Sequence, residues 1–581
     1  MISILNRHSS KNNIILISTL IIILFIITCF GIPFTHWWFT GDDFHGIFLG
    51  YKTKTWSDLF YFFCDGHTNQ GVGNPGGYVY SKPDFLGAYY RPLYCIYLAL
   101  QFWLFGTNGY GYFLCNITAH ALAAGLLFYL IAQYASQWTA GLAAFLFAFH
   151  PQIAYRFGAT VNFHYYVNVV LVLCIALALQ SYLKKNSSWA LCTALGCYAL
   201  SLLTRETTIV LPGVIGILLV ANAYANNKKP DWLFIIKLCC AFGFIGLGFI
   251  GLRLWLYPLS QIAPNGTFLP YAAKGNFVAI KSQEFLIFFY DLLFVSWLPW
   301  GNKLFKIILL IPLLSLLCYT FFLCRQKLLV SCFFISGILM LWPGLISFYS
   351  PRYIYESMPF FLAGFATLFI TSQLHHNIKF LLKIGSTCFV GGFAFFTFTA
   401  FQAREQKLQT MHKAVDKLCL ISEAAQRPLC FLTQPSDGTP GPQLFWILFN
   451  NREKDIYFDA ALSITQRDSN IVKPSKWFNA IAPYYDKNFV TCTPTKQGFD
   501  FFSSDATKIF FESEVSDRDQ KIGTIETLEQ SSNEKVTAIR LKISDLIWQQ
   551  QPLFVNWNYE KKQFDIFDFT ILSNAKFNYT N

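Results

Sequence analysis

Charged residues are scarce in this chain of 581 residues. Asp, Glu, Lys and Arg make up 13% of it, whereas 54% of the residues are hydrophobic and 18% are aromatic. Soluble proteins of similar length carry about 25% charged residues. The deficit argues against a water-soluble protein and indicates a membrane protein.

Features of zinc-binding, disulfide-rich and nucleic-acid-binding proteins are missing as well. The 16 Cys form no CxxC pair and no Cys/His spacing of a zinc site. Several of them, such as Cys239 and Cys240, lie inside apolar runs, where Cys packs as a small apolar residue. The net charge of +12 is spread over segments between apolar runs, with no basic stripe carrying interleaved aromatics. The sequence therefore predicts no nucleic-acid partner and leaves the redox compartment open.

About eleven apolar segments approach the length of about 20 residues that crosses a bilayer as a helix. They are Ile14–Pro33, Gly109–Tyr134, Trp138–Phe149, Phe163–Leu183, Trp189–Leu203, Thr207–Ala225, Trp232–Trp255, Lys303–Cys324, Leu328–Ile346, Tyr355–Ser372 and Ile378–Phe401. The third is the shortest. No small-residue cleavage site follows the first, so we expect a retained span rather than a signal peptide.

Basic residues orient these spans, because cytoplasmic loops are enriched in Lys and Arg. Arg7 and Lys11 place the N-terminus in the cytoplasm. Alternation then places every later basic cluster there too, namely Lys184–Lys185, Lys228–Lys229, Arg325–Lys327 and His375–Lys383. This agreement requires that Glu284–Trp300 lies in the outer interface as a surface helix.

The predicted fold class is a polytopic α-helical membrane protein of about 11 transmembrane helices with a C-terminal soluble α+β domain. Residues 1–403 form the transmembrane domain, including a large outer loop at 35–108 in which Arg91–Phe105 is an interfacial amphipathic helix. Residues 404–581 form the outer domain, where charges return. In this domain Lys407–Gln426 is expected to be a helix, and Leu429–Thr433 and Lys508–Phe511 short strands.

A carboxylate pair follows the first span in the sequence Thr-Gly-Asp-Asp-Phe-His. Asp42 and Asp43, with His45 beside them, suit general-base work or a divalent cation such as Mg²⁺ or Mn²⁺. A solvated turn is the alternative, since Gly-Asp is ordinary turn chemistry. Whether a metal is bound is not decided by the sequence.

Further polar residues lie at the outer ends of the predicted spans, where ionisable groups are usually functional or paired. They are Arg91, His150, Arg156, Arg205, Glu206, Arg352 and Tyr353. Each has a structural alternative: a surface anchor, a helix-end His, or an Arg–Glu pair with neighbours. Guanidinium groups match phosphate oxygens bidentately, so their shared location predicts a site for an anionic phosphorylated substrate.

These motifs resemble, in order, those of the C-type (GT-C) superfamily of polyprenyl-phosphate-sugar-dependent membrane glycosyltransferases, including the protein O-mannosyltransferases. The resemblance covers roughly Ile14 to Phe401. The residues that carry it are Gly41-Asp42-Asp43-Phe44, Tyr90-Arg91-Pro92-Leu93, Asn116 with His120-Ala121-Leu122, His150-Pro151, Leu203-Thr204-Arg205-Glu206 with Leu211-Pro212, and Pro351-Arg352-Tyr353-Ile354-Tyr355.

The resemblance implies an inverting transfer of sugar from a polyprenyl-phosphate donor to a protein, lipid or glycan acceptor outside the cytoplasm. It assigns the base to Asp42 or Asp43, with Asp42 preferred, and donor-phosphate contacts to Arg205 and Arg352. One departure is that the acidic residue usual after His-Pro is absent from Gln152–Arg156. We hypothesise that Arg156 and His164 replace it as phosphate or acceptor contacts.

Two other interpretations stay open at this point: a transporter or flippase of lipid-linked sugar, and a non-catalytic assembly protein. A transporter would place charges near mid-membrane in helices of related halves. The expected location is the bacterial inner membrane, with the C-terminal domain in the periplasm.

Overall fold

The structure is a computed structural model. It describes residues 2–39, 43–64, 90–150, 162–256, 315–347, 354–373 and 375–425, and nine strands between Leu429 and Phe567. Contacts divide the chain into two units. The helical unit comprises Met1–Trp37, Thr55–His67 and Asp84–Arg404, and the second unit comprises Trp38–Lys54, Thr68–Pro83 and Glu405–Asn581.

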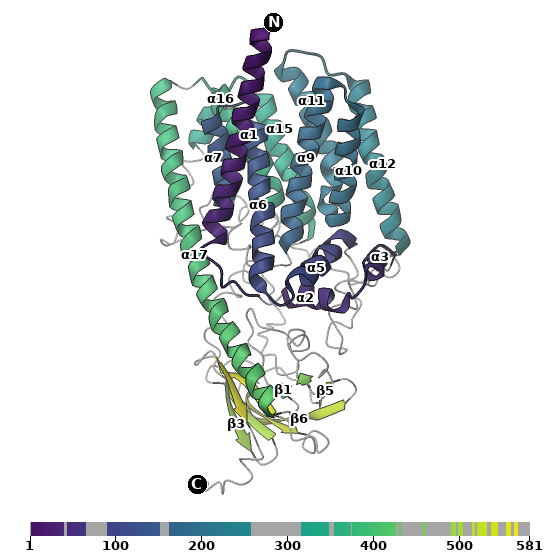
Figure 1. The fold of residues 1–581 in the computed structure, drawn as a ribbon, viewed down its shortest axis with the longest axis vertical. Coiled ribbons are helices and arrows are strands. Elements are labelled where there is room, and N and C mark those ends of the chain that lie inside the picture. Colours follow the sequence, from purple (N-terminus) through teal and green to yellow (C-terminus); the bar gives the residue numbers. More distant parts are fainter. Residues whose placement is uncertain are drawn as a thin grey trace. The chain divides into compact units, whose positions relative to one another are not determined.

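The helical unit is built mainly of long apolar helices, and helices joined by a described turn, such as α9 and α10 or α11 and α12, run in opposite directions (Figure 1). Their bounds are α1 (Ile2–Gly31), α6 (Gly109–Ala132), α7 (Gln137–Ala148), α9 (Phe163–Lys185), α10 (Ser188–Thr204), η2 (Glu206–Val210), α11 (Leu211–Ala225), α12 (Trp232–Leu256), α15 (Lys327–Ser347) and α16 (Ile354–Thr371). The helix α17 (His376–Ala425) begins in this unit.

Seven stretches among the described residues are long and apolar enough to cross a membrane. They are Asn13–Gly31, Gly109–Ala132, Phe163–Lys185, Glu206–Ala225, Trp232–Leu256, Ile354–Thr371 and Phe380–Leu418. Each coincides with one of the predicted spans, so the chain is a multi-pass membrane protein. The apolar helices α7 and α10 are shorter, with 12 and 17 residues. Glu284–Trp300 lies outside the described residues, and the total of about eleven spans stays a prediction.

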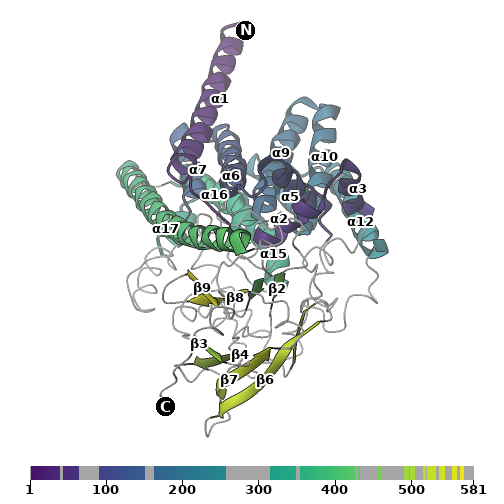
Figure 2. The ribbon, with the colours of Figure 1, turned by 60° about the horizontal axis from the view of Figure 1, so that its bottom comes forward.

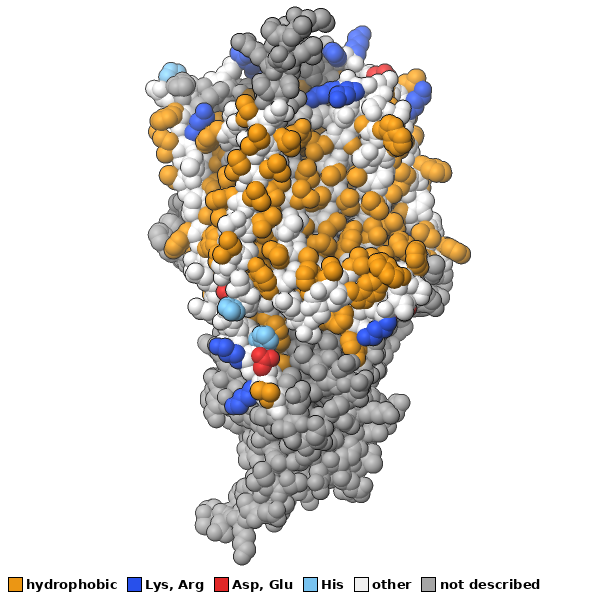
Figure 3. All heavy atoms as spheres, viewed as in Figure 1, with side chains coloured by type: hydrophobic (Ala, Val, Ile, Leu, Met, Phe, Trp, Pro, Cys, Tyr) orange, Lys and Arg blue, Asp and Glu red, His pale blue; other side chains and the backbone are white. Residues whose placement is uncertain are grey.

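The basic clusters gather at one end of the helices. The connections α9–α10, α11–α12 and α16–α17 lie at the same end (Figure 1), and Lys and Arg side chains are visible there beyond a belt of hydrophobic side chains (Figure 3). Lys184 Nζ donates to Gln133 Oε1 over 3.2 Å, and Lys383 Nζ lies 5.4 Å from the centre of the Trp138 ring. This is the arrangement that alternating spans with basic loops on one side predict.

Close helix contacts depend on small residues and on aromatic rings, because helices gain little hydrophobic driving force within lipid. A Cβ on Gly125 of α6 would lie 2.5 Å from Ile23 of α1, so Gly is needed where these helices approach. Phe401 of α17 lies against α1, with its ring centroid 5.4 Å from that of Phe30. Thr397 of α17 donates to the Phe149 carbonyl over 3.0 Å. These contacts attach the first half of α17 to α1 and α7.

A hydrophobic core joins the four helices α9 to α12. Val172, Tyr198, Val214 and Phe242 are buried there, one from each helix, and Tyr90 packs against the same core. Tyr90 precedes the predicted interfacial helix, which forms as α5 (Pro92–Phe105) and crosses the ends of α9 and α10 opposite to the basic loops (Figures 1 and 2). The short helix α3 (Trp56–Cys64) packs against α5. This core fixes the start of α5 beside the turn between α10 and α11.

The second unit contains α2 (Asp43–Lys52), the end of α17 and two separate sheets (Figure 2). The strands are β1 (Leu429–Phe431), β2 (Ile456–Phe458), β3 (Val490–Thr495), β4 (Gly498–Ser503), β5 (Glu514–Asp517), β6 (Gln520–Gln530), β7 (Val536–Ile543), β8 (Leu553–Asn558) and β9 (Gln563–Phe567). One sheet has the order β2-β1-β8-β9, and the other, fully antiparallel, has the order β3-β4-β7-β6-β5.

The predicted helix of the tail is present as part of a longer one. Lys407–Gln426 was expected to be a helix, and its residues up to Ala425 form the end of α17, which runs for 50 residues without a break. Helix hydrogen bonds depend on local backbone geometry, so a fall in hydropathy near Arg404 does not end a helix. The predicted strand Leu429–Thr433 matches β1, whereas Lys508–Phe511 lies outside the described residues.

Candidate functional site

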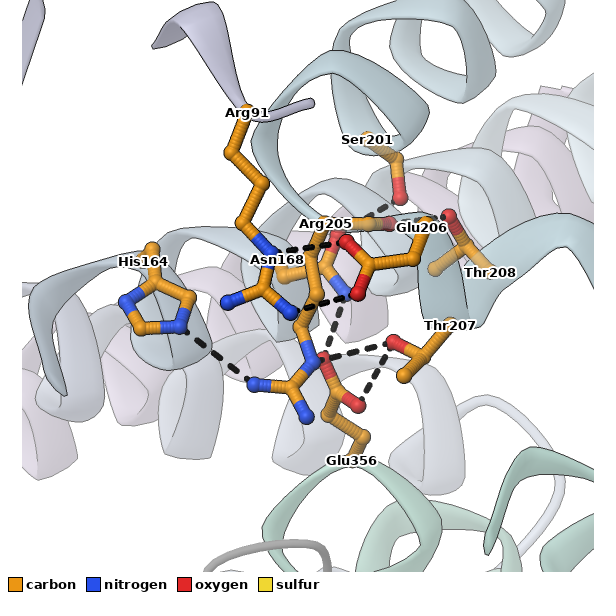
Figure 4. Close-up of polar contacts among 9 residues, drawn as sticks. All are labelled: Arg91, His164, Asn168, Ser201, Arg205, Glu206, Thr207, Thr208 and Glu356. Atoms are coloured by element: carbon orange, nitrogen blue, oxygen red, sulfur yellow. Dashed lines mark hydrogen bonds and ion pairs between the residues drawn. The ribbon is translucent and has the colours of Figure 1, made fainter. Parts of the chain in front are cut away.

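A buried polar cluster lies in the helical unit, at the helix ends opposite to the basic loops. Its side chains come from the start of α5, the first turns of α9, the last turn of α10, η2 and the first turn of α16 (Figure 4). All nine residues drawn in Figure 4 belong to the helical unit, so their mutual geometry is defined within one unit.

The backbone at Arg205 places its side chain inside the protein. The helix α10 ends at Thr204, and Arg205 is extended with φ −163° and ψ 124° before η2 begins. Its N–H donates to the Ser201 carbonyl over 2.7 Å, and its carbonyl accepts from Thr208 Oγ1 over 3.1 Å. The guanidinium is therefore directed into the helix bundle, where Arg205 is fully buried.

Glu356 of α16 neutralises Arg205. Arg205 Nε lies 2.9 Å from Glu356 Oε1, and the two side chains are 0% and 2% exposed. Arg205 Nε also donates to Thr207 Oγ1 over 3.0 Å, and Thr207 Oγ1 donates to Glu356 Oε2 over 2.8 Å. A charge buried to this degree is tolerated only when it is paired and hydrogen-bonded, and here both conditions hold.

Asn168 and Ser201 hold Glu356 in place from the other side. Asn168 Nδ2 donates to Glu356 Oε1 over 2.7 Å, while Asn168 Oδ1 accepts from Ser201 Oγ over 2.6 Å. Asn168 and Ser201 are themselves buried. The chain of hydrogen bonds joins α10, α9 and α16, so the orientation of the Glu356 carboxylate is set by three helices.

Aromatic rings of α9 bound the other side of the Arg205 guanidinium. Its Cζ lies 3.6 Å from the centre of the Tyr165 ring, a cation–π contact that compensates part of the lost hydration. Nη1 lies 3.4 Å from His164 Nε2. Because a guanidinium can only donate, His164 Nε2 is the acceptor in this contact.

A second ion pair, Arg91 with Glu206, lies next to the first (Figure 4). Arg91 Nε donates to Glu206 Oε2 over 2.7 Å, and Arg91 Nη2 donates to Glu206 Oε1 over 2.5 Å. Arg205 also attracts the Glu206 carboxylate electrostatically. The Arg91 and Glu206 side chains are 15% and 20% exposed. The pair is bidentate, which is the strong geometry for Arg and a carboxylate, and it is partly open to solvent.

The start of α16 is fixed by a further buried contact. His120 Nδ1 of α6 lies 2.9 Å from the Tyr355 hydroxyl, and His120 Nε2 lies 3.2 Å from the Ala148 carbonyl at the end of α7. Tyr355 directly precedes Glu356. The contact therefore positions the residue that neutralises Arg205.

We expect Tyr355→Phe to lower the free energy of unfolding by about 1–3 kcal/mol, because it removes a hydroxyl partner from a buried His. The measurement is denaturant unfolding of the purified protein in detergent. Tyr319→Phe is the matched control, since Tyr319 is 53% exposed. Equal stability of the two variants would contradict a structural role for the Tyr355 hydroxyl.

The structure brings four of the predicted site residues together, namely Arg91, His164, Arg205 and Glu206. His150 is buried just beyond α7. Asp43 is buried at the first position of α2 in the second unit, and His45 lies on the same helix. Asp42, Arg156, Arg352 and Tyr353 lie outside the described residues, so their roles stay predictions.

Sequence reasoning missed Glu356, Asn168 and Thr207. A signal for Glu356 was present, because a carboxylate within an apolar span is expected to have a partner or a function. Asn168 and Thr207 gave no comparable signal, since single amides and hydroxyls are common in membrane helices. Arg205 and Glu206 were expected, as the structural alternative, to pair with neighbours, and each forms its hydrogen-bonded ion pair with a residue distant in the sequence.

A divalent cation requires several oxygen ligands. In the part of the chain that the structure describes, no three His, Cys, Asp or Glu side chains are grouped to hold a metal ion. Glu206 and Glu356 are each committed to an Arg. A cation was predicted beside Asp42 and Asp43. Asp42 lies outside the described residues, so this site stays a prediction.

Comparison with known proteins gave structural matches only. No protein-family profile matches the chain, and a search of curated proteins found no match. Two of the matching solved structures are ArnT from Cupriavidus metallidurans, one bound to undecaprenyl phosphate and one in the apo state. The first is 11% identical, covers 76% of this chain and 89% of its own, and has a TM-score of 0.39. The second is 12% identical, covers 75% and 88%, and has a TM-score of 0.37.

At such low similarity, the function has to be argued from the residues of the site itself.

Proposed function

We propose that this protein is an inverting glycosyltransferase that moves a sugar from a polyprenyl-phosphate donor to an acceptor on the outer side of the membrane. The observation that carries the proposal is the pair of adjacent Arg–Glu ion pairs at the end of the bundle opposite to the basic loops. Two guanidinium groups at one membrane surface match the anionic headgroup of a lipid phosphate.

In the proposed reaction the carboxylate of Asp42 or Asp43 takes the proton of the acceptor hydroxyl. The acceptor oxygen attacks the anomeric carbon as the bond from that carbon to the phosphate oxygen breaks. The electron pair of that bond leaves with the polyprenyl phosphate, and attack from the opposite face inverts the anomeric centre. Arg205 and Arg91 stabilise the charge that develops on the leaving phosphate.

The location of the ion pairs argues against a transporter. Arg205 follows the last residue of α10, and Glu356 is the third residue of α16, so both lie at helix ends. A carrier that alternates access would place its binding charges near mid-membrane, in interrupted helices. The positions fit a reaction at the surface of the membrane with a lipid-anchored substrate.

The proposal leaves the acceptor as a protein, a lipid or a glycan. It places the active side in the periplasm of a bacterial inner membrane, because the basic loops define the cytoplasmic side. Arg352, Tyr353, Arg156 and His150 are proposed as further contacts of the donor or the acceptor.

We expect that replacing the catalytic base with its amide lowers sugar transfer about 100-fold, the lower range for loss of a general base. The variants are Asp42→Asn and Asp43→Asn, made singly and assayed in membranes with polyprenyl-phosphate sugars. Asp231→Asn is the matched control. Its carboxylate is exposed, accepts from the Phe234 N–H over 3.0 Å, and lies at the basic end of the helices.

Full transfer by both Asp42→Asn and Asp43→Asn would show that neither residue is the base. Absence of transfer by the wild-type protein from every polyprenyl-phosphate sugar tested would overturn the proposed function as a whole.

A further inference from the structure

The two ion pairs of the site differ in how firmly they are held. Glu356 is fixed by Asn168 and Thr207 as well as by Arg205, and its pair with Arg205 is closed to solvent. Both oxygens of Glu206 are instead directed at the fork of Arg91, in a pair that is 15% and 20% exposed. Glu356 in the inner pair is held by several partners, whereas Glu206 in the outer pair is the carboxylate that can exchange.

The Glu206 carboxylate presents to Arg91 the same pair of oxygens that a phosphate would present. Arg binds carboxylates and phosphates through the same two parallel N–H groups. In the present structure Nε and Nη2 of Arg91, which form this fork, both donate to Glu206. A phosphate can therefore reach the fork of Arg91 only when Glu206 leaves it.

We propose that Glu206 is an internal competitor for Arg91 that yields its place to the donor phosphate and returns when the product leaves. The inference rests on the proposed function and adds to it a residue that sets the affinity for phosphorylated lipid. With Glu206 bound, the two Arg and two Glu of the cluster balance in charge. With phosphate bound, Arg91 is still neutralised, and the displaced carboxylate moves to its solvent-exposed side.

Exchange of this kind solves a problem of product release. A phosphodiester donor carries one negative charge, whereas the phosphomonoester product carries about 1.5 to 2 at neutral pH, so two unopposed Arg would hold the product more tightly than the donor. A carboxylate that competes for the same fork weakens the binding of both. It speeds the release of polyprenyl phosphate while leaving the Arg205–Glu356 pair intact.

The test measures binding of a polyprenyl monophosphate to the purified protein in detergent. Glu206→Gln keeps the size of the side chain and removes the charge that competes, so we expect its dissociation constant to fall about tenfold, as when a blocked site becomes fully available. In the transfer assay KM and kcat should both fall, because substrate and product are both held longer. A merely structural role of Glu206 predicts weaker binding and a raised KM.

A double-mutant cycle separates competition for Arg91 from a general electrostatic effect. In the Arg91→Gln background, Glu206→Gln should no longer tighten binding, because the shared fork is gone. If the tightening persists there, the carboxylate acts at long range and the inference is wrong. Polyprenol without phosphate should bind all four proteins equally, and inorganic phosphate should show the same order of affinities as the lipid phosphate.

The remaining outcomes are distinguishable. Unchanged affinity of Glu206→Gln for the lipid phosphate would overturn the exchange of Glu206 and leave the proposed function standing. Failure of the wild-type protein to bind any polyprenyl monophosphate would overturn both proposals.

Discussion

Glu356→Gln should destabilise the protein by about 3–5 kcal/mol, the usual cost of removing one partner from a buried ion pair. The substitution keeps the shape of the side chain and an oxygen that accepts from Asn168, but it replaces the oxygen that accepts from Thr207, so the loss reports the charge together with that hydrogen bond. Arg205 is fully buried, and its guanidinium would lose its counter-charge at 2.9 Å. The measurement is the free energy of unfolding in detergent.

Asp416→Asn is the control for this prediction. It also removes a carboxylate from a side-chain contact, that of Asp416 Oδ1 with His412 Nε2 at 3.4 Å, whose side chains are 60% and 47% exposed. An exposed pair contributes about 0–1 kcal/mol, so the control should be nearly neutral. A loss for Glu356→Gln as small as that of the control would mean that Arg205 does not depend on Glu356 for its charge.

The sequence was sufficient to predict the described helices of the helical unit. It was not sufficient to predict which residues their polar side chains contact. Apolar runs of about 20 residues identify spans because the bilayer fixes their length, and Lys and Arg in the loops fix their direction. Hence the sequence could predict that Arg91, Arg205 and Glu206 lie at the end of the helix bundle opposite to the basic loops. Their partners could not be predicted, because nothing in a single sequence brings Glu356 to Arg205 across 150 intervening residues.

The pairing of neighbours shows the same limit at short range. Arg205 and Glu206 are adjacent, and pairing of the two with neighbours was one of the expectations. The extended backbone at Arg205 and the start of η2 at Glu206 send the two side chains to different partners, Glu356 and Arg91. This geometry depends on where α10 ends, and element boundaries are what sequence patterns define least well.

The carboxylate pair after the first span shows a different limit. Gly41-Asp42-Asp43-Phe44 was expected to form a turn or a catalytic loop. Asp43 instead begins α2 and is buried, where a carboxylate in the first turn is favoured by the helix dipole. A sequence that serves as a turn also serves as a helix start, because both use Asp to satisfy free N–H groups.

Adding Arg205→Met to Glu356→Gln should restore most of the lost stability, because the unpaired charge is removed and an apolar side chain of similar length remains. Replacement of a whole buried ion pair by neutral groups is often close to neutral, so we expect the double variant to unfold within about 2 kcal/mol of the wild type. Sugar transfer should nevertheless be about 1,000-fold lower, as is usual when an Arg that stabilises a leaving phosphate is lost.

This double variant separates the two roles that a buried Arg can have. If Arg205 served only the framework, transfer would recover together with stability. If Arg205 contacts the donor phosphate, folding recovers and transfer does not. Arg205→Lys with Glu356 retained is the matched control: it keeps the charge but loses the planar fork, so it should fold with a smaller loss than Glu356→Gln and still transfer sugar poorly. Recovery of transfer in the double variant would assign the phosphate to Arg91 alone.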